Sequence, residues 1–264
     1  MAQNGGSGGL VSHEKGGGVS SIDAGKPAGR HRGSGGSEGA LLDALNRLNP
    51  DIGILPVADA SFRRFGEMHR GFRVASLLAY LDDHATVGDA VVDEPDAIGI
   101  GRFPEETLPL QRAVFGGVND LQAGWLYGAG SSLAMLEYHK CAEVMVAGAD
   151  MVLFVGRAQD IEWPEGAYDL SRVQAFLLPR GTVCEIAPGS LHCVPLHARR
   201  ADGFRCIVIL PRGTGGTLDF PPPATGEARL LHGRNTWLIA HSTGGRDGAR
   251  HHGLKGRDIE LVTL

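Results

Sequence analysis

Hydrophobic and polar positions divide the chain into regions with different predicted structures. Residues 1–39 contain 13 glycines and no aromatic residue, so they cannot bury enough apolar surface to offset the entropy lost on ordering. This stretch is expected to be a disordered tail. In residues 40–48 leucines recur at helical spacing, and Pro50 follows shortly after them. A helix is therefore expected there.

The region up to residue 119 is expected to form a mixed α/β segment that packs on the main domain. Its apolar spacing predicts a strand over residues 52–57 and short helices over residues 60–65, 74–81 and 105–114. Asp59 is placed to cap the first of these helices. Pro109 lies inside the last one, where a proline removes a backbone donor.

Short apolar runs alternate with glycine, proline and aspartate turns from residue 120 onwards. Eight runs lie between residues 121 and 210, and two more lie at residues 237–240 and 259–262. This spacing is typical of an all-β sandwich or barrel. Residues 120–212 are expected to form the barrel, and residues 213–264 to add a loop and C-terminal strands that complete it. A second, degenerate barrel built from the two flanks is an alternative.

Composition narrows the class of protein. The net charge is −5, which argues against a nucleic-acid binder held by phosphate contacts. No apolar run approaches the roughly 20 residues that span a bilayer, and the N-terminal residues do not resemble an export signal. A cytoplasmic protein without membrane or nucleic-acid partners is therefore expected. The four cysteines include no C-x-x-C pair, so a zinc ribbon is not indicated and reduced thiols are expected.

Candidate metal ligands occur in two segments of the predicted barrel. Glu137 and His139 are two residues apart in a strand-like run, so their side chains share a face, and Glu143 follows after three residues. Further along the chain, a Pro-Gly turn at Pro188 precedes His192. A small barrel can bring such residues to one interior point.

These segments resemble the two motifs of cupins, a superfamily with a double-stranded β-helix (jelly-roll) barrel. The first motif has the form H-x-H-x3–4-E, with Glu137 in place of the first histidine here. The second joins a Pro-x-Gly segment, at residues 179–181, to the P-G-x-x-H turn that ends at His192. The predicted fold is therefore mainly β, a cupin barrel with an N-terminal α/β segment. Two imidazoles and two carboxylates suit Mn or Zn best, with Co, Ni or Fe as alternatives.

Segments spread along more of the chain resemble one particular family of cupins. The segments L-E-Y-H-K-C-A-E, Q-A-G at residue 122, F-R-R-F-G at residues 62–66, W-L-I-A-H and G-L-K-G are similar to a bacterial cupin family of uncharacterised-domain type that includes metal-dependent sulfoquinovose isomerases. The resemblance implies an aldose–ketose isomerase that acts on a small-molecule sugar, with sulfoquinovose as the named candidate. A homo-oligomer is also expected. An Fe-dependent oxygenase and a non-catalytic sugar-binding cupin are the alternatives.

Several other residues are candidates for roles in catalysis or substrate binding. Glu185 is expected to be the catalytic base or a fifth ligand, with an outward-facing strand residue as the equal alternative. Gln122, Lys255 and His241 are candidates for contacts to substrate, although a structural role is favoured for each. A sulfonate would require a cationic partner, and the sequence offers Arg64, Arg157, Arg172 and Arg205 without choosing among them.

Overall fold

The computed structural model describes residues 34–241 and 251–264. The first helix, α1 (Ser34–Leu48), begins six residues earlier than expected and takes in the end of the predicted tail. The rest of that tail, residues 1–33, lies outside the described residues. The buried positions Leu41 and Leu45 of α1 are four residues apart, as a helix with one apolar face requires.

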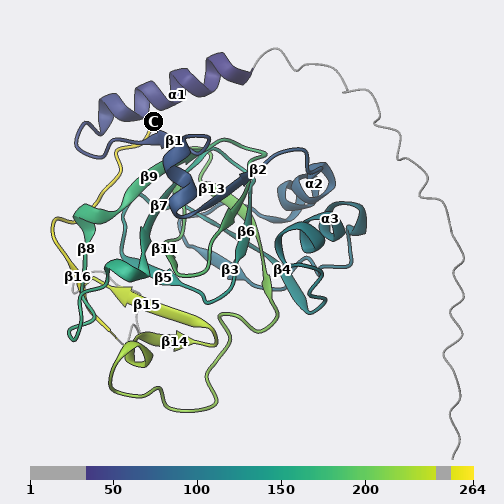
Figure 1. The fold of residues 1–264 in the computed structure, drawn as a ribbon. Helices are drawn as coiled ribbons and strands as arrows, with labels where there is room; N and C mark the ends of the chain where they lie inside the picture. Colours follow the sequence, from purple (N-terminus) through teal and green to yellow (C-terminus); the bar gives the residue numbers. More distant parts are fainter. Residues whose placement is uncertain (1–33, 242–250) are drawn as a thin grey trace, which may run out of the picture.

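Two facing β-sheets form the body of the protein (Figure 1). The strands of the first sheet are, in spatial order, β1 (Leu55–Pro56), β9 (Gln174–Leu178), β7 (Met151–Arg157), β11 (Ser190–His192), β5 (Met135–Tyr138), β15 (Thr236–Ala240) and β14 (Leu231–Gly233), with β12 (Leu196–His197) also paired to β7. Those of the second sheet are β2 (Gly66–His69), β10 (Val183–Ile186), β6 (Glu143–Ala147), β13 (Phe204–Pro211), β4 (Leu121–Gly128) and β3 (Val92–Glu94).

The connections between these strands produce a jelly roll. The chain passes from β5 in the first sheet to β6 in the second and back to β7, and β9, β10 and β11 repeat the crossing. All pairs are antiparallel except β1 with β9 and a small separate pair, β16 (Leu254–Lys255) with β8 (Tyr168–Asp169). The fold is therefore a mainly β jelly-roll barrel, as the sequence predicts. Strands from both flanks join the same two sheets, so the described residues form no second barrel.

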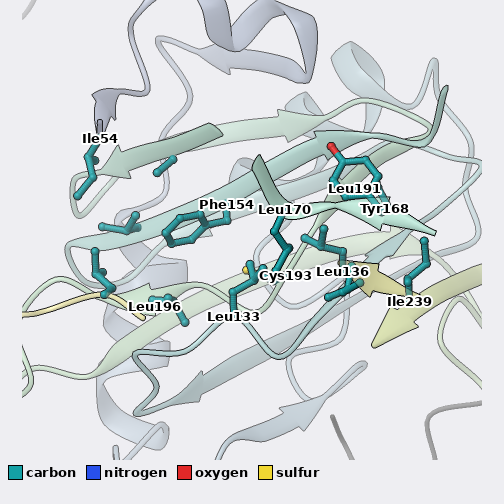
Figure 2. Packing of buried hydrophobic residues seen from close by; sticks show 14 of the residues in the cluster. Ile54, Leu133, Leu136, Phe154, Tyr168, Leu170, Leu191, Cys193, Leu196 and Ile239 are labelled. Carbon is teal, nitrogen blue, oxygen red and sulfur yellow. The ribbon is translucent and has the colours of Figure 1, made fainter. Parts of the chain in front are cut away.

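Apolar side chains fill three layers because both faces of each sheet are buried. The layer between the sheets includes Met145 from the second sheet and Leu153 and Phe176 from the first. The outer face of the first sheet packs under α1 and the C-terminal segment, through residues such as Phe154 and Ile239 (Figure 2). The outer face of the second sheet packs against helices α2 (Ala75–His84) and α3 (Pro104–Val114).

The N-terminal elements form near the predicted positions, but some of them are shorter than predicted. The expected helix over residues 60–65 is the 3-10 helix η1 (Ala60–Arg64), and Asp59 caps it by accepting from the Ser61 N–H at 2.8 Å. The expected strand over residues 52–57 is reduced to β1. The apolar run at residues 259–262 forms no strand and makes one isolated bridge, from Glu260 to Ser132. Three further 3-10 turns occur, η2 (Ala158–Asp160), η3 (Leu170–Arg172) and η4 (Glu227–Leu230).

Candidate metal centre

A cavity of about 170 Å³ lies between the two sheets, on the side where β3 and β14 form their edges. Strands β3, β4, β13 and β6 supply one wall, and β14, β15, β5 and β11 supply the other. The lining mixes apolar and polar side chains, and it includes six acidic or imidazole side chains: Asp93, Glu137, His139, Glu143, His192 and His232. Four of these are the ligands that the sequence predicts.

The four predicted ligands come from three strands that place them around one point. Glu137 on β5 is directly opposite His192 at the end of β11, and His139 follows two residues after Glu137. Glu137, His139 and His192 each offer a ligand atom, and these atoms lie within 4.8 Å of one another. The Oε2 atom of Glu143 lies 3.3 Å from His139 Nε2 and 3.2 Å from His192 Nε2.

The hydrogen bonds of the two histidines decide which ring nitrogens face this point. His139 Nδ1 lies 2.9 Å from the carbonyl oxygen of Asn235, and His192 Nδ1 lies 3.0 Å from that of Ser190. A carbonyl oxygen only accepts, so each Nδ1 carries a proton and donates it. The Nε2 atoms are then the ones directed at Glu143. This arrangement is the usual support of histidines that bind metal ions.

The charge at this point requires a cation of some kind. His139 and His192 are both about 95 % buried or more, as is Glu143. Two imidazole Nε2 atoms that face one carboxylate oxygen need either protons or a bound cation between them, because unprotonated nitrogens and a carboxylate present only lone pairs. Two imidazoles with two carboxylates form a donor set that fits a divalent ion of the Mn or Zn type.

The pKa values of His192 and Glu143 show how strongly these two groups interact. Burial lowers the pKa of His192, but the charge of Glu143 and the hydrogen bond to it outweigh burial and raise the pKa to about 9. Burial likewise raises the pKa of Glu143, yet His192 and His139 together hold it well below its ordinary value. The site is thus built to keep the Glu143 carboxylate ionised and to hold positive charge beside it.

Glu185 does not face this cavity, and the expectation that it shares a face with His192 is wrong. On β10, Cys184 and Ile186 lie opposite Met145 and Glu143, whose side chains point between the sheets. Glu185 alternates with them and therefore points to the outer face. There its carboxylate Oε2 lies 2.9 Å from Nε2 of His69. The outward-facing alternative is the correct description of Glu185.

The three candidates for substrate contacts lie in different places. Gln122 lines the cavity, but its amide is committed to the loop after β13: its Oε1 accepts from the Gly213 N–H at 2.7 Å, and its Nε2 donates to the Thr214 carbonyl at 3.2 Å. Lys255 pairs with Glu162, and His241 lies 2.7 Å from Asp258. Neither Lys255 nor His241 lines the cavity, so the structure does not bring these two residues to the candidate ligands.

No lysine or arginine of the described ranges lines the cavity. The four arginines considered for a sulfonate lie elsewhere: Arg205, for example, lies 3.4 Å from Asp82, and Arg172 lies 3.7 Å from Glu162. The cationic groups that can face a ligand within this cavity are therefore histidines.

Three residues of the site were not singled out in the sequence. Asp93 lies opposite Leu126, which lines the cavity, so the register of β3 on β4 turns Asp93 inward. His232 reaches the cavity from β14, and Asn235 holds His139. The one available signal was the V-D-E run of β3, which lies in a stretch whose mixed pattern predicts no element.

One protein-family model matches most of the chain. The model of a family described as Domain of unknown function (DUF4867) matches residues 54–259. The chain belongs to this family. The DUF4867 match includes all six acidic and imidazole residues of the cavity and leaves out α1. No curated protein matches the sequence.

Solved structures that resemble the chain include cupins at low similarity. A cupin-2 domain protein from Shewanella frigidimarina is 19% identical, with a TM-score of 0.24 over 38% of this chain and 78% of that one. The non-heme α-ketoglutarate-dependent epimerase SnoN from nogalamycin biosynthesis is 13% identical, with a TM-score of 0.34 over 85% and 100%. The L-ribose isomerase of Cellulomonas parahominis is 11% identical, with a TM-score of 0.31 over 63% and 74%. At these values the similarities transfer no activity to this chain.

In the described part of the chain, no helix is both long and apolar enough to cross a bilayer.

Proposed function

We propose that the chain is a metal-dependent aldose–ketose isomerase that acts on a small sugar. The observation that carries the proposal is one cavity that combines the four candidate ligands with two further proton-carrying groups, Asp93 and His232. A divalent ion held by Glu137, His139, Glu143 and His192 would supply Lewis-acid polarisation of the sugar carbonyl. Glu137 in place of the usual histidine favours Mn²⁺ or Zn²⁺.

The reaction needs a group that moves a proton between two carbons of the substrate. The C2–H bond breaks, its electron pair forms the C1–C2 double bond, and the proton passes to a base. The π pair of the C1 carbonyl moves onto O1, which takes up a proton and completes the enediol. The base then returns its proton to C1 while the C2 hydroxyl releases a proton to replace the one taken up by O1, so substrate and product are isomers and no oxidant is consumed. Since Glu185 faces outward, we assign this role to Asp93 or His232, which face the cavity from opposite sheets.

Sulfoquinovose is the named candidate substrate, on the resemblance of the sequence motifs. The lining favours the neutral, hydroxyl-bearing part of a sugar, because no lysine or arginine of the described residues faces it. A sulfonate would therefore lie at the mouth of the cavity, outside its wall. A screen should compare neutral aldoses with sulfoquinovose, and faster turnover of the neutral sugars would remove sulfoquinovose from the proposal.

The proposal is tested by measuring proton exchange between the substrate and the solvent. Purified protein loaded with Mn²⁺ or Zn²⁺ is incubated with each aldose in D2O, and deuterium at C1 or C2 is measured together with ketose formation. We expect Asp93→Asn or His232→Gln to reduce exchange by about 10²–10⁴-fold, the usual range for loss of a general base, with metal content unchanged. Glu185→Gln is the matched control and should exchange at the wild-type rate.

Three outcomes contradict the proposal. Oxygen consumption that depends on Fe²⁺ would indicate an oxygenase. Sugar binding without turnover, unchanged by removal of the metal, would indicate a binding protein. Full exchange in both the Asp93 and the His232 variants would show that the base lies elsewhere.

A further inference from the structure

We propose that Asn235 is the positioning residue of the candidate metal centre, through which the turn between β14 and β15 orients His139. The inference rests on the proposed metal site and does not depend on isomerase activity. Asn235 has a φ of 54°, the one positive φ of a non-glycine residue within residues 34–241 and 251–264. Asparagine tolerates this left-handed conformation better than most residues, but it still costs free energy.

The contacts of Asn235 explain why that conformation is kept. Its carbonyl oxygen accepts from His139 Nδ1 at 2.9 Å, and its side-chain Oδ1 accepts from the Lys140 N–H at 3.0 Å. Its Nδ2 lies 3.0 Å from Sγ of Cys141, to which it donates. One residue therefore binds three consecutive residues that follow β5, and the first of these is a candidate ligand.

The same side chain also reaches the wall of the cavity. Asn235 Nδ2 lies 3.3 Å from Oγ1 of Thr214, which lines the cavity with Gly215. The loop that contains them is tied to the turn by the Gly215 N–H to Arg234 carbonyl bond at 2.9 Å and the Arg234 N–H to Gly216 carbonyl bond at 2.8 Å. Gln122 holds the other side of this loop. Asn235 thus links His139, a candidate metal ligand, to the part of the cavity wall that a substrate would touch.

The consequence for His139 concerns its protonation and its direction. The bond from Nδ1–H to the Asn235 carbonyl selects the tautomer whose Nε2 faces Glu143, and it prevents rotation of the ring. The side chain of Asn235 fixes where that carbonyl lies. Removing it should leave the carbonyl present but no longer held against residues 139–141.

The test uses Asn235→Gly, because glycine accepts the positive φ and keeps the backbone carbonyl. Partners of this kind typically contribute 10–100-fold to metal affinity, so we expect the Kd for Mn²⁺ to rise by about 10–100-fold. The electron paramagnetic resonance spectrum of bound Mn²⁺ should change as the ligand geometry loosens. Asn235→Asp keeps the acceptor for Lys140 and should lose less affinity.

Asn46→Ala is the matched control. It also deletes an asparagine side chain with two backbone hydrogen bonds, both to Ile54, on the far side of the first sheet. We expect it to lower the unfolding temperature while the Kd and the spectrum stay as in the wild type. Wild-type affinity and spectrum in Asn235→Gly would overturn the role, and so would equal losses in Asn46→Ala.

Failure of the metal site and failure of the isomerase proposal give different results. If the wild-type protein binds no Mn²⁺, Zn²⁺ or Co²⁺, the metal centre is wrong and the role of Asn235 falls with it. If it binds metal but isomerises no sugar, the isomerase proposal fails while the effect of Asn235→Gly on affinity still stands.

Discussion

The space between the two sheets has two ends with opposite chemistry. At one end, β7 and β9 contribute apolar side chains such as Leu153 and Phe176 to the layer between the sheets, and Phe176 packs against Phe62 and Phe65 with ring centroids 5.1 and 6.1 Å apart. At the other end, β5, β6 and β11 turn carboxylates and imidazoles inward around a cavity. The close-packed end can hold the strands in register while the polar end carries groups that a well-packed core would exclude.

Two buried histidines show how strongly the surroundings differ. His197 on β12 lies opposite Met151 of the apolar layer and accepts a hydrogen bond from the Gly130 N–H at 3.0 Å. Burial, helped by Arg200, lowers its pKa below 6.5, so it remains neutral. His192 is equally buried, but Glu143 raises its pKa to about 9. Similar burial therefore produces a neutral histidine at one end and a positively charged or metal-binding one at the other.

The largest effect is expected from removing a ligand at the polar end. His192→Ala should weaken Mn²⁺ or Zn²⁺ binding by more than about 100-fold, the upper range for loss of a supporting partner alone. Metal content after purification and a metal titration measure it, with circular dichroism to confirm the β fold. His139→Ala should behave in the same way. His197→Ala is the matched control, and full metal occupancy in both ligand variants would refute the site.

Truncation of a side chain at the apolar end should reduce the stability of the fold rather than the affinity for metal. Phe176→Ala removes a fully buried ring between two other aromatic side chains and should lower the free energy of unfolding by about 3–5 kcal/mol. Chemical denaturation of the metal-free protein measures this loss. The Kd for metal of the folded fraction should stay near the wild-type value. A large loss of affinity would mean that the two ends are not independent.

The neutral histidine predicts a dependence of stability on pH. The pKa of His197 is lower in the folded state than its ordinary value of 6.5. Its contribution to stability is therefore complete above about pH 6.5 and is lost as the pH falls from there towards the folded-state pKa. Thermal unfolding of wild type and His197→Ala between pH 5 and 8 tests this. The difference between the two proteins should be smallest at the acidic end, and a difference that grows on acidification would reverse the assignment.

The smallest effect is expected at Glu185. Its ion pair with His69 is partly exposed on the outer face of the second sheet, and such pairs contribute less than about 1 kcal/mol. Glu185→Gln should thus leave metal content and proton exchange unchanged and alter the unfolding temperature slightly. Loss of metal or of turnover in this variant would show that Glu185 faces the cavity after all.

The strands and the predicted ligands could be recognised in the sequence because both depend on residues that are close together along the chain. Turn residues separate the short apolar runs between residues 121 and 210, and β4, β6, β7, β9, β10 and β13 form in that region. Glu137, His139 and Glu143 lie within seven residues of one another, so alternation along one strand and the next turn brings them together. The Pro-Gly turn before His192 supplied the second local pattern.

The sequence by itself determined a mainly β fold and named the side chains of the candidate metal centre. The tertiary structure alone decided which way Glu185 points, and that Asp93, His232 and Asn235 join the site. Alternation defines two faces of a strand but not which face is inside, and here both faces of each sheet are buried by apolar residues. Asn235 lies 96 residues from His139, and only the pairing of β15 with β5 brings the two together.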